Sequence, residues 1–198
     1  MVTGSRHGMT VAQKISFKQM LRTLEYRLTD VCHGDCVGVD EEAHAIVREH
    51  FKQRVRIHVF PPEDNELRAY CGNGKEDGEE VRIYDPTSYL RRDKDMVDAS
   101  RAVIAMPFES NEKVRSGTWS SIRHARAAGR FLCIIYPDGT MKMNKPEKRM
   151  RVVKSYDTLK KARKASKTTD QETATGNVNP VPPQLARYSP SFEEERMC

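Results

Sequence analysis

Three small polar residues stand where a helix is expected to begin, and their chemistry suits anion binding. Ser116, Gly117 and Thr118 separate an apolar run, 102–106, from a helical pattern that ends before Gly129. The first amides of a helix lack partners within the helix and carry the positive end of its dipole. With two hydroxyl groups, and a glycine that admits a ligand close to the backbone, they can hold a phosphate without an acid or base.

Two more glycine-containing loops follow expected strands, and two arginines could add positive charge beside them. In an open parallel sheet, ligands bind beyond the carboxyl ends of the strands, where all three loops should meet. A guanidinium there can hold a phosphate through two hydrogen bonds. The sequence therefore predicts a phosphate-bearing ligand, although glycine-rich turns also occur in α/β proteins for purely structural reasons. The candidate binding residues are Gly4, Ser5, Arg6, Gly34, Asp35, Gly38, Arg92, Ser116, Gly117 and Thr118.

Apolar runs alternate with helical patterns along most of the chain, which predicts an α/β fold. Ile15 should lie on the buried face of the first helix, and Asp40 should be the N-cap of the second. Near-continuous apolar strands joined by helices are typical of a Rossmann-like, doubly wound, mainly parallel sheet. The expected strands are 1–3, 30–34, 55–60, 102–106 and 131–136, and the expected helices are 11–28, 39–51, 89–99 and 118–128.

Charge and composition divide the chain into a neutral domain and a basic tail. Lysine and arginine exceed aspartate and glutamate by 34 − 28 = 6, and all of this excess falls after residue 140. We expect a domain over 1–140 with a polar insertion at about 63–88. A basic extension should follow at 141–166, with a short strand near 151–156 and a helix from about 157. The segment 167–198 has few large apolar residues, which favours disorder.

Cysteine content and hydropathy indicate an intracellular protein. The chain has five cysteines, an odd number, and it opens without an apolar signal region. No apolar run approaches the ~20 residues of a membrane span, so we expect a reduced, cytoplasmic protein with no membrane partner. Cys32, His33 and Cys36 raise the question of a zinc site, but no second cysteine pair has matching spacing. We therefore expect neither a metal nor a cofactor.

Four segments together resemble the SLOG superfamily, which groups the DNA-processing protein Smf/DprA with the lonely-guy phosphoribohydrolases. "VTGSR" at 2–6 is similar to the first-strand motif, and "HGDCVGVDEEAH" at 33–44 resembles the DprA-type glycine loop. "RRDKDMVDASRAVIAMP" at 91–107 is similar to the Arg-x-x-x-Met helix of the lonely-guy and YspA-like branches. "RSGTWSSIRHARAAGRFLCIIYPDG" at 115–139 resembles the DprA-type Ser-Gly-Thr helix. The resemblance covers residues 1–140.

The resemblance implies a Rossmann-like domain with a pocket for a nucleotide or nucleotide-derived ligand, and by the same resemblance a homodimer paired through helices. Lonely-guy enzymes use the motif Pro-Gly-Gly-x-Gly-Thr-x-x-Glu to hydrolyse an N-glycosidic bond. Here "VRS" replaces the glycine pair, and the glutamate position falls on Ser121. A serine cannot replace a carboxylate in that chemistry. Glu109 or Asp98 are the candidate substitutes for the catalytic acid.

Three functions therefore stay open. The first is a nucleotide-binding sensor or sequestering module, which needs the loops and arginines alone. The second is an N-glycosidic hydrolase or transferase acting on nucleoside monophosphates or nucleotide sugars. The third is a DprA-like protein that binds single-stranded DNA, helped by the basic tail. A structural role that reuses the fold with an empty pocket is a fourth reading.

Overall fold

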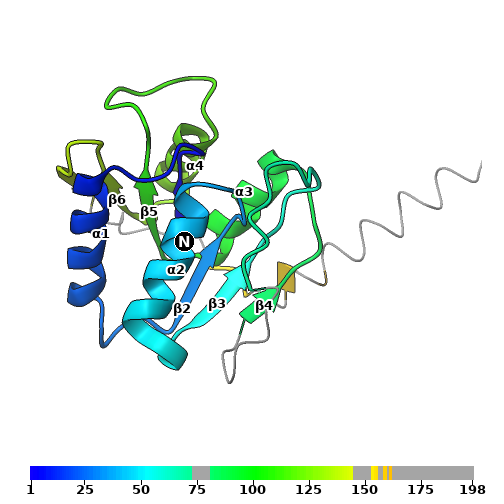
Figure 1. Ribbon diagram of the computed structural model, residues 1–198. Helices are drawn as coiled ribbons and strands as arrows, with labels where there is room; N and C mark the ends of the chain where they lie inside the picture. The colour runs from blue at the N-terminus through cyan, green and yellow to red at the C-terminus, as the bar shows by residue number, and fades with distance from the viewer. Residues whose placement is uncertain (73–80, 145–152, 156–157, 160, 162–198) are drawn as a thin grey trace, which may run out of the picture. The chain divides into compact units, whose positions relative to one another are not determined.

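The structure is a computed structural model that describes residues 1–72, 81–144, 153–155, 158–159 and 161 (Figure 1). Strands and helices alternate from the first residues, as the sequence predicts. The strands are β1 (Val2–Gly4), β2 (Asp30–His33), β3 (Arg56–Val59), β4 (Val81–Ile83), β5 (Ala102–Met106), β6 (Phe131–Ile135) and β7 (Met141–Asn144). The helices are α1 (Val11–Thr23), α2 (Val39–Phe51), the 3₁₀ turn η1 (Lys52–Arg54), α3 (Tyr89–Ala99) and α4 (Gly117–Ala127).

The strands form two hydrogen-bonded ladders, β1-β5-β6-β7 and β2-β3-β4. All strand pairs are parallel except β6 with β7, which are antiparallel. Strands β1 and β2 contact each other and bring the two ladders side by side. The chain thus winds outward from β1 in one direction through β2 to β4, and in the other through β5 to β7. The carboxyl ends of β1 and β5 flank the point where the direction switches, which is where such sheets bind ligands.

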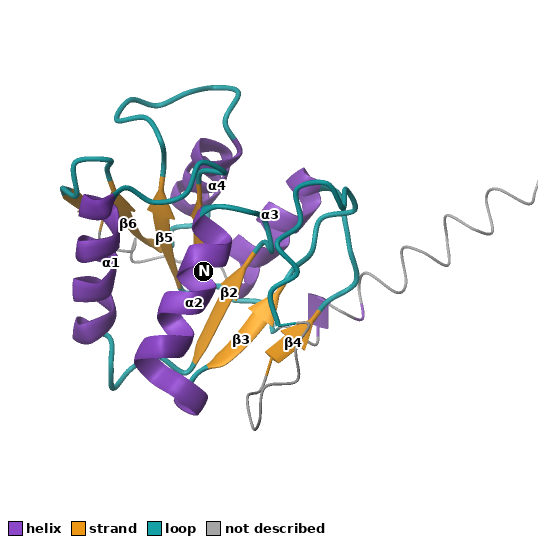
Figure 2. Cartoon of the chain, viewed as in Figure 1, coloured by secondary structure: helices purple, strands orange, loops and turns teal. Residues whose placement is uncertain are grey.

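Helices cover both faces of the strands, which confirms the Rossmann-like, doubly wound α/β fold (Figure 2). Side chains of α1 and α2 pack on one face around Phe17, Leu21 and Val47. On the other face, Trp119 and Ile122 of α4 pack with Val97 of α3 and with residues of β5 and β6. Parallel strands buried on both faces need apolar residues at successive positions, and that is why "AVIAM" and "FLCII" read as continuous apolar runs.

Helix α1 is shorter than predicted and lies differently on the sheet. It ends at Thr23, five residues before the expected end, and Ile15 is 63% exposed rather than buried. The Thr23 hydroxyl donates to the carbonyl of Met20 at 2.7 Å, and the amide of Leu24 turns to Leu21 instead. A threonine that bonds back to its own helix competes with the next helical hydrogen bond, and the chain leaves the α-helix there.

The other departures concern short strands. The predicted insertion at 63–88 contains β4, which pairs with β3, and β7 extends the sheet beyond residue 140. Of the strand predicted at 151–156, only 153–155 are described, and they form no strand. Of the helix predicted from 157, residues 158, 159 and 161 are helical, with Leu159 buried, and the compact unit runs from Met1 to Lys161. The tail 167–198 lies outside the described residues.

Candidate functional site

A cavity of about 580 Å³ opens at the carboxyl ends of β1 and β5. Its volume falls in the range of roughly 300–1,000 Å³ that is common for small-molecule sites. Segments far apart in the sequence line it: the end of β1, the first turn of α3, and the loop from β5 into α4. The lining residues are Thr3, Gly4, Ser5, Arg6, His7, Cys36, Asp40, Tyr89, Leu90, Arg92, Asp93, Phe108, Glu109, Lys113, Arg115, Ser116, Gly117 and Thr118.

The turn after β1 brings Ser5 and Arg6 to the cavity. The amide of Gly8 donates to the carbonyl of Ser5 at 3.3 Å, which closes a tight turn, and the Ser5 hydroxyl accepts from the amide of His7 at 3.0 Å. The amide of Val39, at the start of α2, donates to the same Ser5 carbonyl at 3.0 Å. The Arg6 guanidinium lies over the Tyr89 ring, 5.4 Å from its centroid. The turn is therefore fixed to α2, while the Arg6 side chain reaches across the cavity toward α3.

The start of α4 opens onto the same cavity. Ser116 is the N-cap, and its hydroxyl accepts from the amide of Trp119 at 3.4 Å. A Cβ atom on Gly117 would meet no described atom within 4 Å, so the backbone there faces open space. Lys113 and Arg115 add positive charge on the loop that precedes the helix, although Lys113 also pairs with Glu109 at 2.8 Å. Free amides, hydroxyl groups and cations thus meet at one end of the cavity, as anion binding requires.

Arg92 lines the cavity but is already engaged by neighbouring groups. Its Nε and Nη2 donate to Asp93 Oδ1 at 3.2 and 3.0 Å, and its Nη1 donates to the carbonyl of Gly34 at 2.8 Å. The side chain is 5% exposed. Arg92 therefore ties α3 to the loop after β2, and Asp93 matches its charge. Arg6, Lys113, Arg115 and the amides of α4 must supply most of the attraction for a phosphate.

Asp40 has a different role from the predicted helix cap. Gly38 is the N-cap of α2, and Asp40 lies one residue inside the helix. Its Oδ2 reaches back to accept from the amides of Gly34 and Cys36 at 3.0 and 3.4 Å, while its buried Oδ1 has no hydrogen-bond partner among the described residues. Burial raises the pKa of this carboxyl to about 6, although the nearby Arg92 acts in the opposite direction. A cavity-lining acid that titrates near neutrality is a candidate functional group.

The loop after β2 supports the cavity more than it lines it. Asp35 is fully buried, accepts from Arg68 Nε at 2.6 Å and from the amide of Cys71 at 2.8 Å, and so holds the segment around 68–71 in place. Gly34 packs against Arg92 and Asp40, which lie 2.8 and 2.9 Å from the position of an added Cβ. Within the part of the chain that the structure describes, Gly34, Asp35 and Gly38 are absent from the cavity lining. Their contribution is positional.

The two candidate acids separate in space. Glu109 lines the cavity near Lys113. Asp98 lies nine residues after the cavity-lining Tyr89 in α3, which is roughly 13 Å further along the helix axis. There Asp98 accepts from Lys154 Nζ at 2.8 Å. Ser121 is fully buried and donates to Asp93 Oδ2 at 3.2 Å. The carboxylate beside Ser121 thus comes from α3, not α4.

Sequence reasoning missed several lining residues that share one helix face or one loop. Arg92 and Asp93 follow Tyr89 by three and four residues, a spacing that places both on the same side of α3 as Tyr89. That spacing around the predicted Arg92 could have found the other two. Phe108 is the second residue after β5, at the edge of the sheet where ligands bind, so the position of the strand end could have predicted it. Cys36 could not be distinguished from a buried core thiol.

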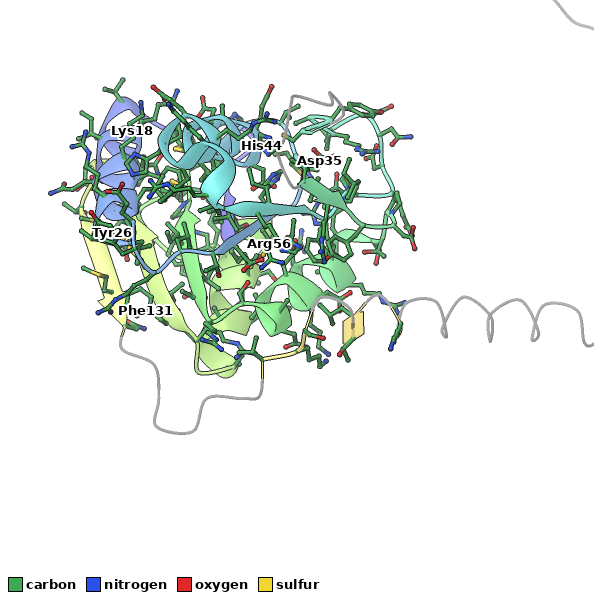
Figure 3. The ribbon with its side chains drawn as sticks, turned by 90° about the horizontal axis from the view of Figure 1, so that it is seen from below. Lys18, Tyr26, Asp35, His44, Arg56 and Phe131 are labelled. Carbon is green, nitrogen blue, oxygen red and sulfur yellow. The ribbon has the colours of Figure 1, made fainter. Side chains whose placement is uncertain are left out.

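A second polar cluster, formed by the buried residues His33, His44 and Cys71, has one ligand atom from each residue within 4.8 Å of the others. Asp35 and His44, labelled in Figure 3, both adjoin His33. The amide of Asp35 donates to His33 Nδ1 at 3.2 Å, and His33 Nε2 and His44 Nδ1 share a hydrogen bond of 2.9 Å. Arg48 Nη1 lies 3.4 Å from the other ring nitrogen of His44. Burial also raises the pKa of the Cys71 thiol. The two histidines are thus joined by a hydrogen bond, and burial disfavours the thiolate form in which Cys71 would bind a metal.

Thiols, membrane spans and likeness to other proteins give no further lead to function. The four cysteines within the described ranges, Cys32, Cys36, Cys71 and Cys133, are buried free thiols. No described helix combines the length and apolar character needed to cross a bilayer. No protein-family model, curated protein or solved structure matches this chain.

Proposed function

We propose that this chain binds a nucleotide or nucleotide-derived ligand, as a sensor or a module that sequesters it. One observation carries the proposal: a single cavity joins the turn after β1 to the start of α4, although more than 100 residues separate them in the sequence. The motifs that resemble the SLOG superfamily fall on both segments, which supports the same ligand class. The phosphate would lie against the amides of Gly117 and Thr118, with Arg6 and Arg115 as counter-charges.

Gly117→Ala tests the phosphate end of the cavity. The methyl group has room in the free protein, so unfolding free energy should stay within about 0.5 kcal/mol of the original chain. It would nevertheless occupy the space through which a phosphate approaches the helix amides, and affinity should fall by about tenfold or more, equivalent to ~1.4 kcal/mol. Thermal-shift titration of the full chain with nucleoside mono-, di- and triphosphates, ADP-ribose, cyclic nucleotides and inorganic phosphate measures both quantities.

The matched control is Ser120→Ala, which shortens a side chain one turn further along α4, away from the cavity lining. A ligand at 100 times its dissociation constant should stabilise the original chain and the control by about 2.7 kcal/mol. Equal affinities of the Gly117→Ala variant and the original chain would place the phosphate elsewhere. The absence of stabilisation by every ligand in the panel would refute the proposed function.

A second candidate function, hydrolysis or transfer at the N-glycosidic bond of such a ligand, is favoured by Asp40. In its protonated form, Asp40 would give its proton to the leaving base nitrogen as the C1′–N bond breaks and the bond pair passes to nitrogen. A water oxygen would bond to C1′, and its released proton would return to the Asp40 carboxylate. This division of roles needs an acid that can both give and accept a proton near neutral pH, and burial raises the pKa of Asp40 to about 6.

Asp40→Asn separates catalysis from binding. The amide oxygen can still accept from Gly34 and Cys36, so ligand affinity should change by less than threefold, whereas release of free base should fall by about 10²-fold or more. Chromatography of the free base after incubation with each nucleoside monophosphate or nucleotide sugar gives the turnover. Glu109→Gln is the control, because Glu109 also lines the cavity but is paired to Lys113. If the original chain releases no base from any of them, binding alone describes the function.

The third hypothesis, binding of single-stranded DNA through the basic tail, stays a prediction, because most of residues 141–198 lie outside the described part of the chain. A homodimer paired through helices stays a prediction as well. The described cavity bears on neither.

A further inference from the structure

Two aromatic rings stand at the edge of the cavity, on the loops that follow the paired strands β1 and β5. His7 follows β1 and Phe108 follows β5, and their ring centroids are 4.8 Å apart with planes inclined at 44°. Both line the cavity. Phe108 is 56% exposed, and Leu90 of α3, which also lines the cavity, is 72% exposed. Apolar groups left uncovered together at the edge of a cavity are a feature of binding surfaces rather than of a folded core.

The backbone beneath both rings is held firmly. The carbonyl of Pro107, next to Phe108, accepts from the buried Gln13 Nε2 at 2.9 Å, and Gln13 also donates to Ile135 at 3.0 Å. His7 belongs to the tight turn closed by the hydrogen bond from Gly8 to Ser5. The backbone that carries each ring is therefore held by hydrogen bonds, although both side chains are exposed. Such pre-ordering lowers the entropy lost when a ligand stacks on them.

Tyr89, the third aromatic residue of the cavity, is already covered by cations. The guanidinium groups of Arg6 and Arg92 lie over its ring, 5.4 and 4.9 Å from the centroid. Among the described residues, no guanidinium group lies over the Phe108 ring, and its one aromatic neighbour is His7. The ring available to a flat ligand group is therefore Phe108, and it begins the loop that ends at the phosphate-binding start of α4. One loop carries an aromatic face at one end and anion-binding groups at the other.

We infer that Phe108, flanked by His7, is a stacking platform for the base of the bound ligand, and that the cavity therefore selects ligands with a nucleobase over sugar phosphates. This inference rests on the proposed nucleotide-binding function. It assigns the base to Phe108 and the phosphate to the start of α4. Stacking on an aromatic ring tolerates any base, because every base has a π-face, so the platform adds affinity without choosing among bases.

The experiment compares ribose 5-phosphate with AMP, GMP, CMP and UMP by isothermal titration calorimetry on the full chain. The original chain should bind its best mononucleotide about tenfold or more tighter than ribose 5-phosphate. Phe108→Ala should remove most of that advantage and leave ribose 5-phosphate affinity within about twofold. Phe108→Tyr should restore the advantage. Val114→Ala is the matched control: Val114 belongs to the same loop and is 85% exposed, but it is absent from the described lining of the cavity.

The affinities of the original chain and of Phe108→Ala distinguish a stacking platform from a purely structural role of Phe108. Equal affinity for ribose 5-phosphate and the mononucleotides in the original chain would overturn the platform while leaving the phosphate site intact. An equal loss of both affinities in Phe108→Ala would also overturn it, because Phe108 would then only shape the loop. Binding of none of the five probes, nor of a short oligothymidylate, would overturn the platform, whereas the wider panel of di- and triphosphates, ADP-ribose and cyclic nucleotides decides whether the proposed function stands. A Phe108-dependent response to the oligothymidylate alone would support the platform and assign its base to a nucleic-acid strand.

Discussion

Gly38→Ala is expected to destabilise the folded chain by roughly 3 kcal/mol or more, with a fall in melting temperature of about 10 °C. Gly38 has φ +90° and ψ −124°, a conformation open to glycine and strained for other residues. An added Cβ would also lie 2.5 Å from the carbonyl oxygen of Arg6 and 2.6 Å from that of Ser5. These are backbone atoms of the turn after β1, so they cannot rotate away as a side chain would.

The comparison with Gly117→Ala makes this prediction specific. Both glycines precede or begin a helix at the same edge of the sheet, and sequence alone assigned both to the ligand. Thermal unfolding of the two variants, measured side by side without ligand, should show a large loss for Gly38→Ala and almost none for Gly117→Ala. Equal stability of the two variants would contradict the close packing of α2 against the Ser5–Arg6 turn. The contact that holds this turn, which forms one wall of the cavity, would then have to be different.

The two glycines also show what sequence could and could not predict here. The alternation of apolar runs and helical patterns predicted the fold, because burial on both faces of a parallel sheet leaves that pattern in the residues. The strand-end rule then placed Gly4, Ser5, Arg6, Ser116, Gly117 and Thr118 on one cavity. It could not separate a glycine needed for backbone packing from one that faces a ligand, because that difference depends on which atoms of another segment lie nearby.

The side chains that determine the charge of the cavity were predicted less well, for a similar reason. Arg92 looked like a phosphate ligand, but its hydrogen bonds go to Asp93 and Gly34. Asp40 looked like a helix cap, yet its carboxylate faces backward to the loop after β2. In both cases the residue lines the cavity, but the sequence did not predict the groups to which its side chain is hydrogen-bonded. Partners are set by tertiary contacts across the sheet, which carry no local signature in the sequence.

Asp40→Asn should raise the unfolding free energy of the chain at pH 8 by up to about 3 kcal/mol. Burial raises the pKa of Asp40 from its ordinary 3.8 to about 6 in the folded protein, and a shift of this size corresponds to about that free energy. The folded state then binds the proton more tightly than the unfolded state. Stability of the original chain therefore falls as pH rises from about 4 to 6, and the whole cost is present above pH 6. The asparagine carries no charge to bury.

Urea denaturation of the original chain and the variant between pH 4.5 and pH 8 measures this difference. The advantage of the variant should be greatest at pH 8 and should shrink as pH falls through 6 toward 4, because the original Asp40 then becomes protonated and neutral. Glu41→Gln is the control, because it removes a carboxylate that is exposed in the same first turn of α2. A constant difference at all pH values would mean that Asp40 does not change its ionisation in this range.

A stabilised Asp40→Asn variant would also bear on function. A buried carboxylate with an unpaired oxygen costs stability, and the chain could avoid that cost with a neutral amide that accepts from the same two backbone amides. Residues that lower stability in this way are expected where a site needs them. If the variant gains stability and keeps its ligand but loses base release, Asp40 acts as the acid of an enzyme. If it gains stability and loses the ligand, the Asp40 carboxylate itself contacts the bound molecule.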